Sequence, residues 1–145
     1  MTQDPPKRER LRFEEFDHQA SQNSRARVRV VLTRRGERYL GEATGVETRE
    51  GASRTAALAA IAAAQAATGG RFTAELMGIK LVRAFDSWIV ITALRAHSSE
   101  ESYPRLLGSS EAPGDDTTRG AVLSVLDAVN RVLQKYLTVD TGRGP

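Results

Sequence analysis

The sequence predicts an α+β fold made of duplicated βββα units, in which two antiparallel three-stranded sheets are each covered by a helix and are related by a pseudo-twofold axis. Three observations carry this prediction. The chain has 145 residues, 40% of them hydrophobic, which is the size of one domain with its own core. One sequence pattern occurs twice along the chain. Within each copy, segments with strand-like alternation precede a segment with helical periodicity.

The internal repeat consists of three segments that recur in the same order later in the chain. The residue numbers of the two members differ by about 69 for the first pair, 67 for the second and 65 for the third. The pairs are 12–17 with 82–86, 39–42 with 106–109, and 53–61 with 118–126. Each pair alone is a weak match, and their common order is what indicates a duplication. The repeat places Gly41 and Gly108 at matching positions, which favours a backbone requirement for glycine at both.

The first unit is predicted to contain three strands and one helix, at residues 10–17, 27–34, 38–47 and 53–68. The second strand alternates between Val or Leu and mostly Arg, the pattern of a half-buried strand. Arg35 and Gly36 supply a hairpin turn after it. Ser53 is the predicted N-cap of the helix, and Gly69 with Gly70 is predicted to end it.

The first helix is rich in alanine, so it has a strong helical propensity and few large side chains. Leu58 and Ile61 are expected to cover its own sheet. Another face has no charge and is suited to close packing against the other unit or a second chain; it consists of Ala56, Ala60, Ala63 and Ala67. We expect Glu at Ala60 or Ala63 to disrupt folding or assembly, whereas Arg54→Glu at the helix start is expected to be tolerated.

The second unit is predicted to contain strands at 78–85, 88–96 and 105–110 and a helix at 117–137. Asp86 and Ser87 are the predicted turn between the first two strands. The central strand is apolar on both faces, which predicts that both faces are covered. Trp88 is expected in the core or a dimer interface. Asn130 interrupts the apolar pattern of the helix, and two readings stay open: a hydrogen bond to a neighbouring loop, or exposure to solvent.

Catalytic and metal-binding patterns are sparse. The chain has no Cys and two His, and no spacing typical of a zinc protease, a P-loop or a nucleophile elbow occurs. His18 and His97 are expected to be solvated, and Asp115 with Asp116 is expected to cap the last helix rather than bind a cation. We therefore expect a protein that is not an enzyme and that has no cofactor and no metal site.

The segment 124–133, Ser-Val-Leu-Asp-Ala-Val-Asn-Arg-Val-Leu, resembles the closing helix of the regulatory domain of 2-isopropylmalate synthases, and the duplicated βββα plan is similar too. The resemblance covers about residues 10–137. It implies a stand-alone regulatory domain without the synthase barrel, pairing with a second copy. In that family an amino-acid effector binds near the loops between third strand and helix. The matching positions here are Gly41, Gly45, Gly108, Ser109, Ser110 and Asp116.

The function expected from these observations is a non-catalytic regulatory or interaction module that forms a homodimer and binds a small effector or a protein partner. The alternative is a nucleic-acid-binding domain. It rests on 21 Lys and Arg residues against 18 Asp and Glu residues, a net charge of +3, and on basic residues near the N-terminus. These are Lys7, Arg8, Arg10, Arg12, Arg25, Arg27 and Arg29. Acidic residues are interspersed among them, which favours a solvated surface instead.

The ends of the chain are predicted to be tails, disordered and basic at 1–9 and flexible at 138–145, around one domain at 10–137 with repeats at 10–70 and 78–137. No apolar run approaches the roughly 20 residues of a membrane span, and the first residues lack a signal-peptide pattern. The absence of Cys fits a reducing compartment, so we expect a cytoplasmic protein that does not contact membranes.

Overall fold

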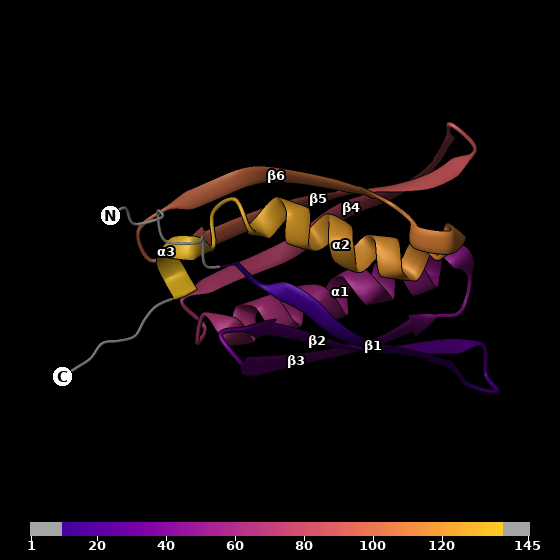
Figure 1. Ribbon diagram of the computed structural model, residues 1–145, viewed down its shortest axis with the longest axis horizontal. Coiled ribbons are helices and arrows are strands. Elements are labelled where there is room, and N and C mark those ends of the chain that lie inside the picture. Colours follow the sequence, from indigo (N-terminus) through magenta and orange to yellow (C-terminus); the bar gives the residue numbers. More distant parts are fainter. Residues whose placement is uncertain (1–9, 138–145) are drawn as a thin grey trace, which may run out of the picture.

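The predicted duplication of a βββα unit is confirmed by a computed structural model, which describes residues 10–137 (Figure 1). The first unit comprises β1 (Arg12–Ala20), β2 (Arg25–Arg34), β3 (Glu37–Val46) and α1 (Arg49–Ala67). The second comprises β4 (Phe72–Ala84), β5 (Ser87–Ser98), β6 (Ser102–Glu111) and α2 (Thr117–Val129). A short 3-10 turn, η1 (Pro113–Asp115), precedes α2, and a one-turn helix, α3 (Gln134–Leu137), follows it. The two predicted tails lie outside the described residues.

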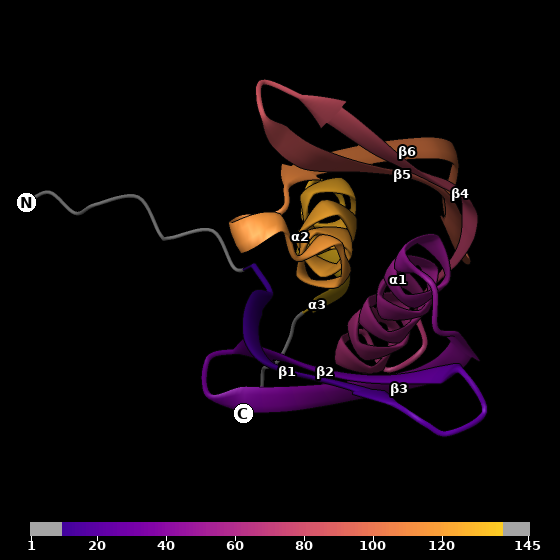
Figure 2. The ribbon, with the colours of Figure 1, turned by 90° about the vertical axis from the view of Figure 1, so that its right-hand side faces the viewer.

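Both helices lie between the two sheets, so each sheet has an inner face toward the helices and an outer face turned away from them (Figure 2). α1 packs on β2 and β3 and also contacts β4, whereas α2 packs on β5 and β6 and also contacts β1. The two helices contact each other, and the buried Ser53 hydroxyl donates a hydrogen bond to Thr117 Oγ1 at 2.8 Å. The two units therefore share one core.

The pairing of residues between neighbouring strands shows which residues of the two units correspond, and we use this correspondence as a common frame. Val30 of β2 pairs with Gly41 of β3, and Thr92 of β5 pairs with Gly108 of β6. At both places the helix runs directly over the glycine. The offsets of 67 between the third strands and 65 between the helices are therefore confirmed by the structure.

The offset of 69 predicted for the first strands is wrong. Phe16 pairs with Val30, and Ile79 pairs with Thr92, so β1 and β4 correspond at an offset of 63. Each of these strands also carries one extra residue at the corresponding place, Glu14 in β1 and Met77 in β4, where the register shifts by a β-bulge. The resemblance of residues 12–17 to residues 82–86 was a chance match of two Phe-containing segments.

Gly41 and Gly108 bring strand and helix backbones into contact. A Cβ on Gly41 would lie 2.0 Å from the carbonyl oxygen of Ala59 in α1. A Cβ on Gly108 would lie 2.0 Å from the carbonyl oxygen of Ser124 in α2. Both distances are shorter than any non-bonded contact of a real Cβ, so the packing excludes every side chain at these positions. The predicted backbone requirement for glycine is therefore a requirement of helix-on-sheet packing.

The first helix begins one turn earlier than predicted. Thr48, and not Ser53, is its N-cap, and the Thr48 hydroxyl accepts a hydrogen bond from Gly51 N at 2.9 Å. The predicted end is confirmed, because the chain leaves the helix through Gly69 and Gly70 with φ of 64° and 83°.

The alanine face of α1 is buried inside the chain, and all four alanines that define it are at most 9% exposed. Ala63 N lies under Gly41 of the same unit, so this face packs within the chain and a second copy does not contact it. Ile61 is buried as expected, whereas Leu58 is 40% exposed, so the prediction that Leu58 covers the sheet is wrong.

The predicted helix at 117–137 is interrupted at residues 130–133. Asn130 ends α2 and its side-chain amide bonds to the backbone of Leu11: Asn130 Oδ1 accepts from Leu11 N at 3.1 Å, and Asn130 Nδ2 donates to Leu11 O at 3.2 Å. Of the two readings of Asn130, the hydrogen bond to a neighbouring segment is confirmed. It pins the chain just before β1 to the second unit.

The β4–β5 hairpin is longer than predicted, and its tip extends past the rest of the fold (Figure 1). Its turn is formed by Phe85 and Asp86, with φ of 54° and 63°, instead of Asp86 and Ser87. The central strand β5 is covered on its inner face only. Val90 is 0% exposed there, whereas Ile91 on the outer face is 36% exposed. The prediction that both faces of this strand are covered is wrong for the chain on its own.

Candidate functional site

A pocket of about 460 Å³ lies at the seam between the two units. Residues 10–13, at the start of β1, form one wall; Ser109 and Ser110 of β6 form another. The end of α2 completes it with Leu123, Leu126, Asp127 and Asn130. Because both units contribute, a molecule bound here would contact both halves of the fold.

The wall from the first unit is held by contacts to α2. Asn130 bonds both backbone polar groups of Leu11, which fixes the neighbouring Arg10 and Arg12 at the rim of the pocket. The Arg119 guanidinium lies 5.3 Å from the ring centroid of Phe13, a cation–π distance that holds the start of α2 against β1. The rim and its apolar wall are therefore positioned by the fold before any ligand arrives.

The wall from the second unit is organised by Asp127. Its Oδ2 accepts hydrogen bonds from Ser109 N at 3.0 Å and from Arg131 Nη2 at 3.3 Å. Arg131 also donates to the carbonyl of Leu107 at 2.5 Å. Both bonds of Asp127 use one carboxylate oxygen, and within residues 10–137 no hydrogen bond to Oδ1 is found. The pocket therefore holds a fixed carboxylate with one oxygen open to a ligand.

The pocket presents three kinds of chemistry. Arg10 and Arg12 at the rim are cations suited to a carboxylate or phosphate, and neither forms an ion pair within the described residues. Asp127 is an anion suited to an ammonium group. Leu123 and Leu126 offer an apolar surface between them. This combination fits a small zwitterion with an apolar side chain.

Sequence reasoning found part of this pocket. Ser109 and Ser110, two of the positions named from the resemblance, line it. Gly108 lies beside them with its α-carbon against α2. Asp116 lies at the other end of the helix, where it is the N-cap of α2 and accepts from Thr118 N at 3.1 Å.

The two other predicted positions, Gly41 and Gly45, lie in the first unit on β3. A Cβ on Gly45 would lie 2.2 Å from the hydroxyl oxygen of Thr55 in α1. Both glycines thus face the helix that covers their sheet. The structure does not bring them together with the positions at the seam.

The residues of α2 that line the pocket were not predicted as site residues. They follow the spacing i, i+3, i+4, i+7, one face of a helix, and are Leu123, Leu126, Asp127 and Asn130. Two polar residues on a face with two leucines are the signal that could have identified them.

The basic residues of the alternative prediction do not gather on one surface. Arg10 and Arg12 lie at the seam pocket. Lys7 and Arg8 lie outside the described residues. The remaining three, Arg25, Arg27 and Arg29, alternate with buried residues along β2 and are exposed on the outer face of the first sheet.

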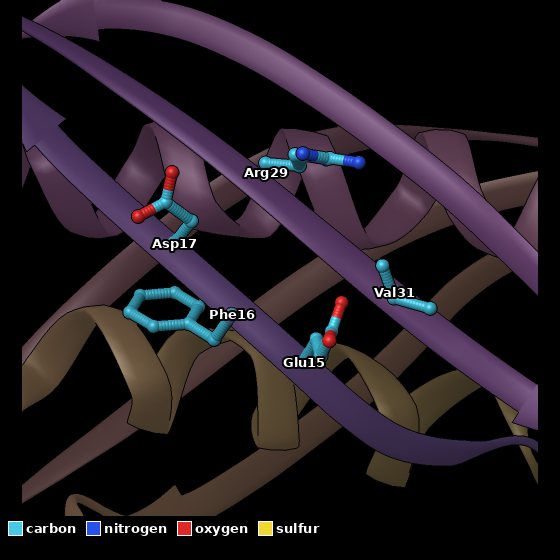
Figure 3. Close-up of a pocket in the computed structure, with 5 residues that line it drawn as sticks. All are labelled: Glu15, Phe16, Asp17, Arg29 and Val31. Carbon is cyan, nitrogen blue, oxygen red and sulfur yellow. The ribbon is translucent and has the colours of Figure 1, made fainter.

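That outer face carries charges of both signs. Arg27 forms an ion pair with Glu42 at 3.6 Å. A pocket of about 290 Å³ beside it has Glu15 and Asp17 on β1 next to Arg29 and Val31 on β2 (Figure 3). Two carboxylates around one guanidinium would repel a phosphate, so this surface favours ordinary solvated ion pairs over nucleic-acid binding.

A second polar cluster lies where α3 meets the β5–β6 hairpin. Glu101 accepts hydrogen bonds from Lys135 Nζ at 2.8 Å and from the hydroxyl of Tyr103. The Tyr136 hydroxyl lies 2.9 Å from that of Tyr103 and 3.0 Å from Ser98 Oγ. The cluster thereby attaches α3 to the hairpin.

The pKa shifts in this cluster follow from burial and from its hydrogen bonds. The hydrogen bonds from Lys135 and Tyr103 lower the pKa of Glu101, and the bond to Glu101 raises the pKa of Lys135, so this pair is ionised at neutral pH. Burial, followed by the bond to Glu101, raises the pKa of Tyr103 well above its ordinary value. Tyr103 is therefore a hydrogen-bond donor at neutral pH and not a base.

The two histidines have local partners. His18 Nε2 lies 2.8 Å from Glu47 Oε1, and His97 Nε2 lies 3.1 Å from Thr73 Oγ1. Across residues 10–137 the structure brings together no group of three or more His, Cys, Asp or Glu side chains that could hold a metal ion. Over the same residues, none of the helices has the length and apolar character needed to span a membrane.

Comparison of the chain with protein-family models and with curated proteins finds no match. The resemblance to the regulatory domain of 2-isopropylmalate synthases therefore stays a prediction.

Proposed function

We propose that the chain is a non-catalytic regulatory module that self-associates and binds a small zwitterionic effector, an α-amino acid with an apolar side chain, in the seam pocket. The observation that supports effector binding is the lining of that pocket. Arg10 and Arg12 face the carboxylate of the effector, Asp127 Oδ1 faces its ammonium group, and Leu123 with Leu126 contacts its side chain.

The position of the pocket suggests how binding would act on the rest of the molecule. The first unit contributes the cations and the second unit contributes the anion, so a zwitterion would link the two units across the seam. The Asn130–Leu11 bonds already join the same walls. An effector would therefore stabilise the two-unit arrangement and bias whatever contact the module makes elsewhere.

A thermal-unfolding screen tests the proposal with the twenty amino acids, inorganic phosphate and nucleotides as probes. A ligand present at 100 times its dissociation constant stabilises the folded state by about 2.7 kcal/mol, which corresponds to roughly 8 °C in Tm for a chain of this size. We expect such a shift for apolar amino acids. Uniform absence of a shift with all amino acids at millimolar concentration contradicts effector binding.

Three variants locate the binding. Asp127→Asn keeps the bond from Ser109 N but removes the negative charge, and Arg12→Ala removes a rim cation, so each should abolish the shift. Arg25→Ala is the matched control, since it removes an exposed arginine of the same sheet that does not line the pocket. If the screen instead finds nucleic-acid binding that weakens steeply with salt and with Arg25→Ala, the alternative function replaces the effector module.

A further inference from the structure

The outer faces of the two sheets differ at corresponding positions. With the common frame given by the strand registers, Arg27 and Arg29 of β2 correspond to Ile89 and Ile91 of β5. The duplicated units thus keep a common backbone frame, while the centre of the outer face is charged in the first sheet and apolar in the second. We call the second of these the apolar sheet face; it consists of Val82, Ile89, Ile91, Ala93 and Leu107.

The apolar sheet face is large for a surface that water alone would cover. Val82 and Ile91 are each 36% exposed, and Leu107 is 48% exposed. Next to them, Met77 in the bulge is 51% exposed and Phe85 at the hairpin tip is 96% exposed. Counted with Met77 and Phe85, which lie outside the defined face, these side chains expose roughly 500 Å² of apolar surface, within the range of the largest patches that monomers show. A standard interface buries about 800 Å² per partner, which a polar rim around this face would complete.

The edges of the same sheet are less available than its face. At β6 the backbone is occupied by side chains of the second unit, because Asp127 accepts from Ser109 N and Arg131 donates to Leu107 O. At β4 the N–H of Ala74 donates to a glutamine side chain of α1 at 2.8 Å, and a bulge distorts the strand further on. Edge-to-edge extension of the sheet is therefore disfavoured, and association through the face is favoured.

Phe85 adds a second observation at the end of this hairpin. It holds φ of 54°, a region that bulky residues rarely adopt and that glycine or asparagine adopts readily. The corresponding hairpin of the first unit, β1–β2, turns through residues 21–24, which include no phenylalanine; the residue with positive φ there is Ser24, at 57°. A phenylalanine that is both strained and 96% exposed is explained by a contact beyond the chain itself.

We propose that two copies of the chain pack face to face through the apolar sheet face, as a twofold-symmetric β-sandwich with Phe85 at its rim. This assigns the surface of self-association and rests on that part of the proposed function. Charge selects the second copy as the occupant. The five residues of the face are uncharged, and the charged side chains around them are of both signs: Lys80 on β4, the Glu75–Arg95 ion pair further along β4 and β5, and Glu111 on β6. A second copy brings the same apolar centre and the same mixed rim, so its charges can stay at the edge of the contact and reach water.

Docking on the charged outer face of the first sheet is the other arrangement open to two copies. It would take Arg27, Arg29 and Asp17 out of water at the centre of the contact, and the desolvation of buried charges is costly even where they pair. The apolar sheet face can meet itself with uncharged side chains at its centre, so the contact is isologous and closes as a dimer.

Leu40 and Leu107 provide a matched pair of test positions. They correspond between the two third strands, each is 48% exposed, and only Leu107 belongs to the apolar sheet face. In sedimentation velocity of the full chain at 1–100 µM, about the range in which ordinary dimers dissociate, Leu107→Arg is expected to weaken dimerisation at least 100-fold. Leu40→Arg is expected to sediment as the wild type does. Circular dichroism confirms that both variants are folded.

A second measurement leaves the interface intact. The chain has no cysteine, so Leu40→Cys and Leu107→Cys each introduce one thiol. We expect the rate of alkylation by iodoacetamide to fall with rising protein concentration for Leu107→Cys and to stay constant for Leu40→Cys. A dimer that persists in Leu107→Arg and leaves the Leu107→Cys thiol reactive overturns the assigned surface while self-association stands. A wild-type chain that is monomeric at 100 µM overturns self-association itself.

Discussion

The closest contact between helix and sheet gives the sharpest prediction, the substitution Gly41→Ala. The added Cβ would lie 2.0 Å from Ala59 O and 2.5 Å from Ala63 N, both of them backbone atoms that cannot rotate away. A carbon and a carbonyl oxygen normally stay about 3.3 Å apart, so α1 has to retreat by about 1.3 Å. A gap of that size removes about half of the van der Waals attraction across the contact.

The expected loss is about 3 kcal/mol, the upper part of the range for overpacking in a core. A domain has about 5–15 kcal/mol of stability in total, so the variant should remain folded but melt roughly 10 °C lower. Urea unfolding followed by circular dichroism measures the free energy of unfolding directly. Gly108→Ala should behave in the same way, because its Cβ would lie 2.0 Å from Ser124 O.

Gly78→Ala is the matched control. Gly78 also lies in a strand, but a Cβ built there meets no atom within 4 Å, and its φ is not in the left-handed region. Alanine at this position should leave stability unchanged or raise it by about 0.5 kcal/mol through the lower entropy of the unfolded chain. If Gly41→Ala and Gly78→Ala differ by less than about 0.5 kcal/mol, the close packing of α1 on β3 is not what requires glycine.

Three further predictions concern other parts of the fold. The buried hydroxyls of Thr92 and Ser124 lie 2.7 Å apart. Thr92→Val should lower the free energy of unfolding, measured in urea, by about 1–3 kcal/mol, because it leaves the Ser124 hydroxyl unpaired. Adding Ser124→Ala gives the second unit the Val and Ala that the first unit has at Val30 and Ala59, and should restore stability. The pKa of Glu101 is lowered in the folded state, so its contribution to stability is present above about pH 4.5 and is lost as the pH falls below that value. Hydrogen exchange of the α3 backbone amides, corrected for the intrinsic rate, should therefore become faster between pH 5 and pH 3. Glu101→Gln should remove this pH dependence. Phe85→Asn should raise the Tm of the monomer, because asparagine adopts a φ of 54° at a lower cost than phenylalanine does. The same substitution should weaken the proposed dimer. A lower Tm would contradict strain at this turn.

The fold was predictable from the sequence because the repeat and the alternation of β2 and β5 reflect the core directly. Val28 and Val90 are 0% exposed, as the alternation requires. The matching glycines were readable for the same reason. The start of the first helix was predicted wrongly because two sequence signals compete there. Thr48 and Ser53 are both residues that favour the N-cap position, and only the packing of the first turn selects Thr48.

The seam pocket was only partly predictable, because its walls come from segments far apart in the chain. Leu11 and Asn130 are 119 residues apart and meet through side-chain-to-backbone bonds that no periodicity encodes. Ser109 and Ser110 were named from the resemblance to the regulatory domain, which points to the end of the third strand. Asp127 was not, because a single acidic residue on an amphipathic helix has the appearance of an ordinary solvated one.

The two units show which positions of a duplicated fold are free to change. Residues under the helices are fixed by backbone contact, so Gly41 and Gly108 cannot vary independently of the helices above them. The outer faces have no such partner within the chain, and they differ most, with arginines on one sheet and isoleucines on the other. An apolar outer face is soluble only if something covers it, whereas a charged one needs nothing. In the proposed dimer, divergence of the two faces gives one unit the surface for association and leaves the other facing solvent, while the seam pocket is where the proposed effector would contact both units.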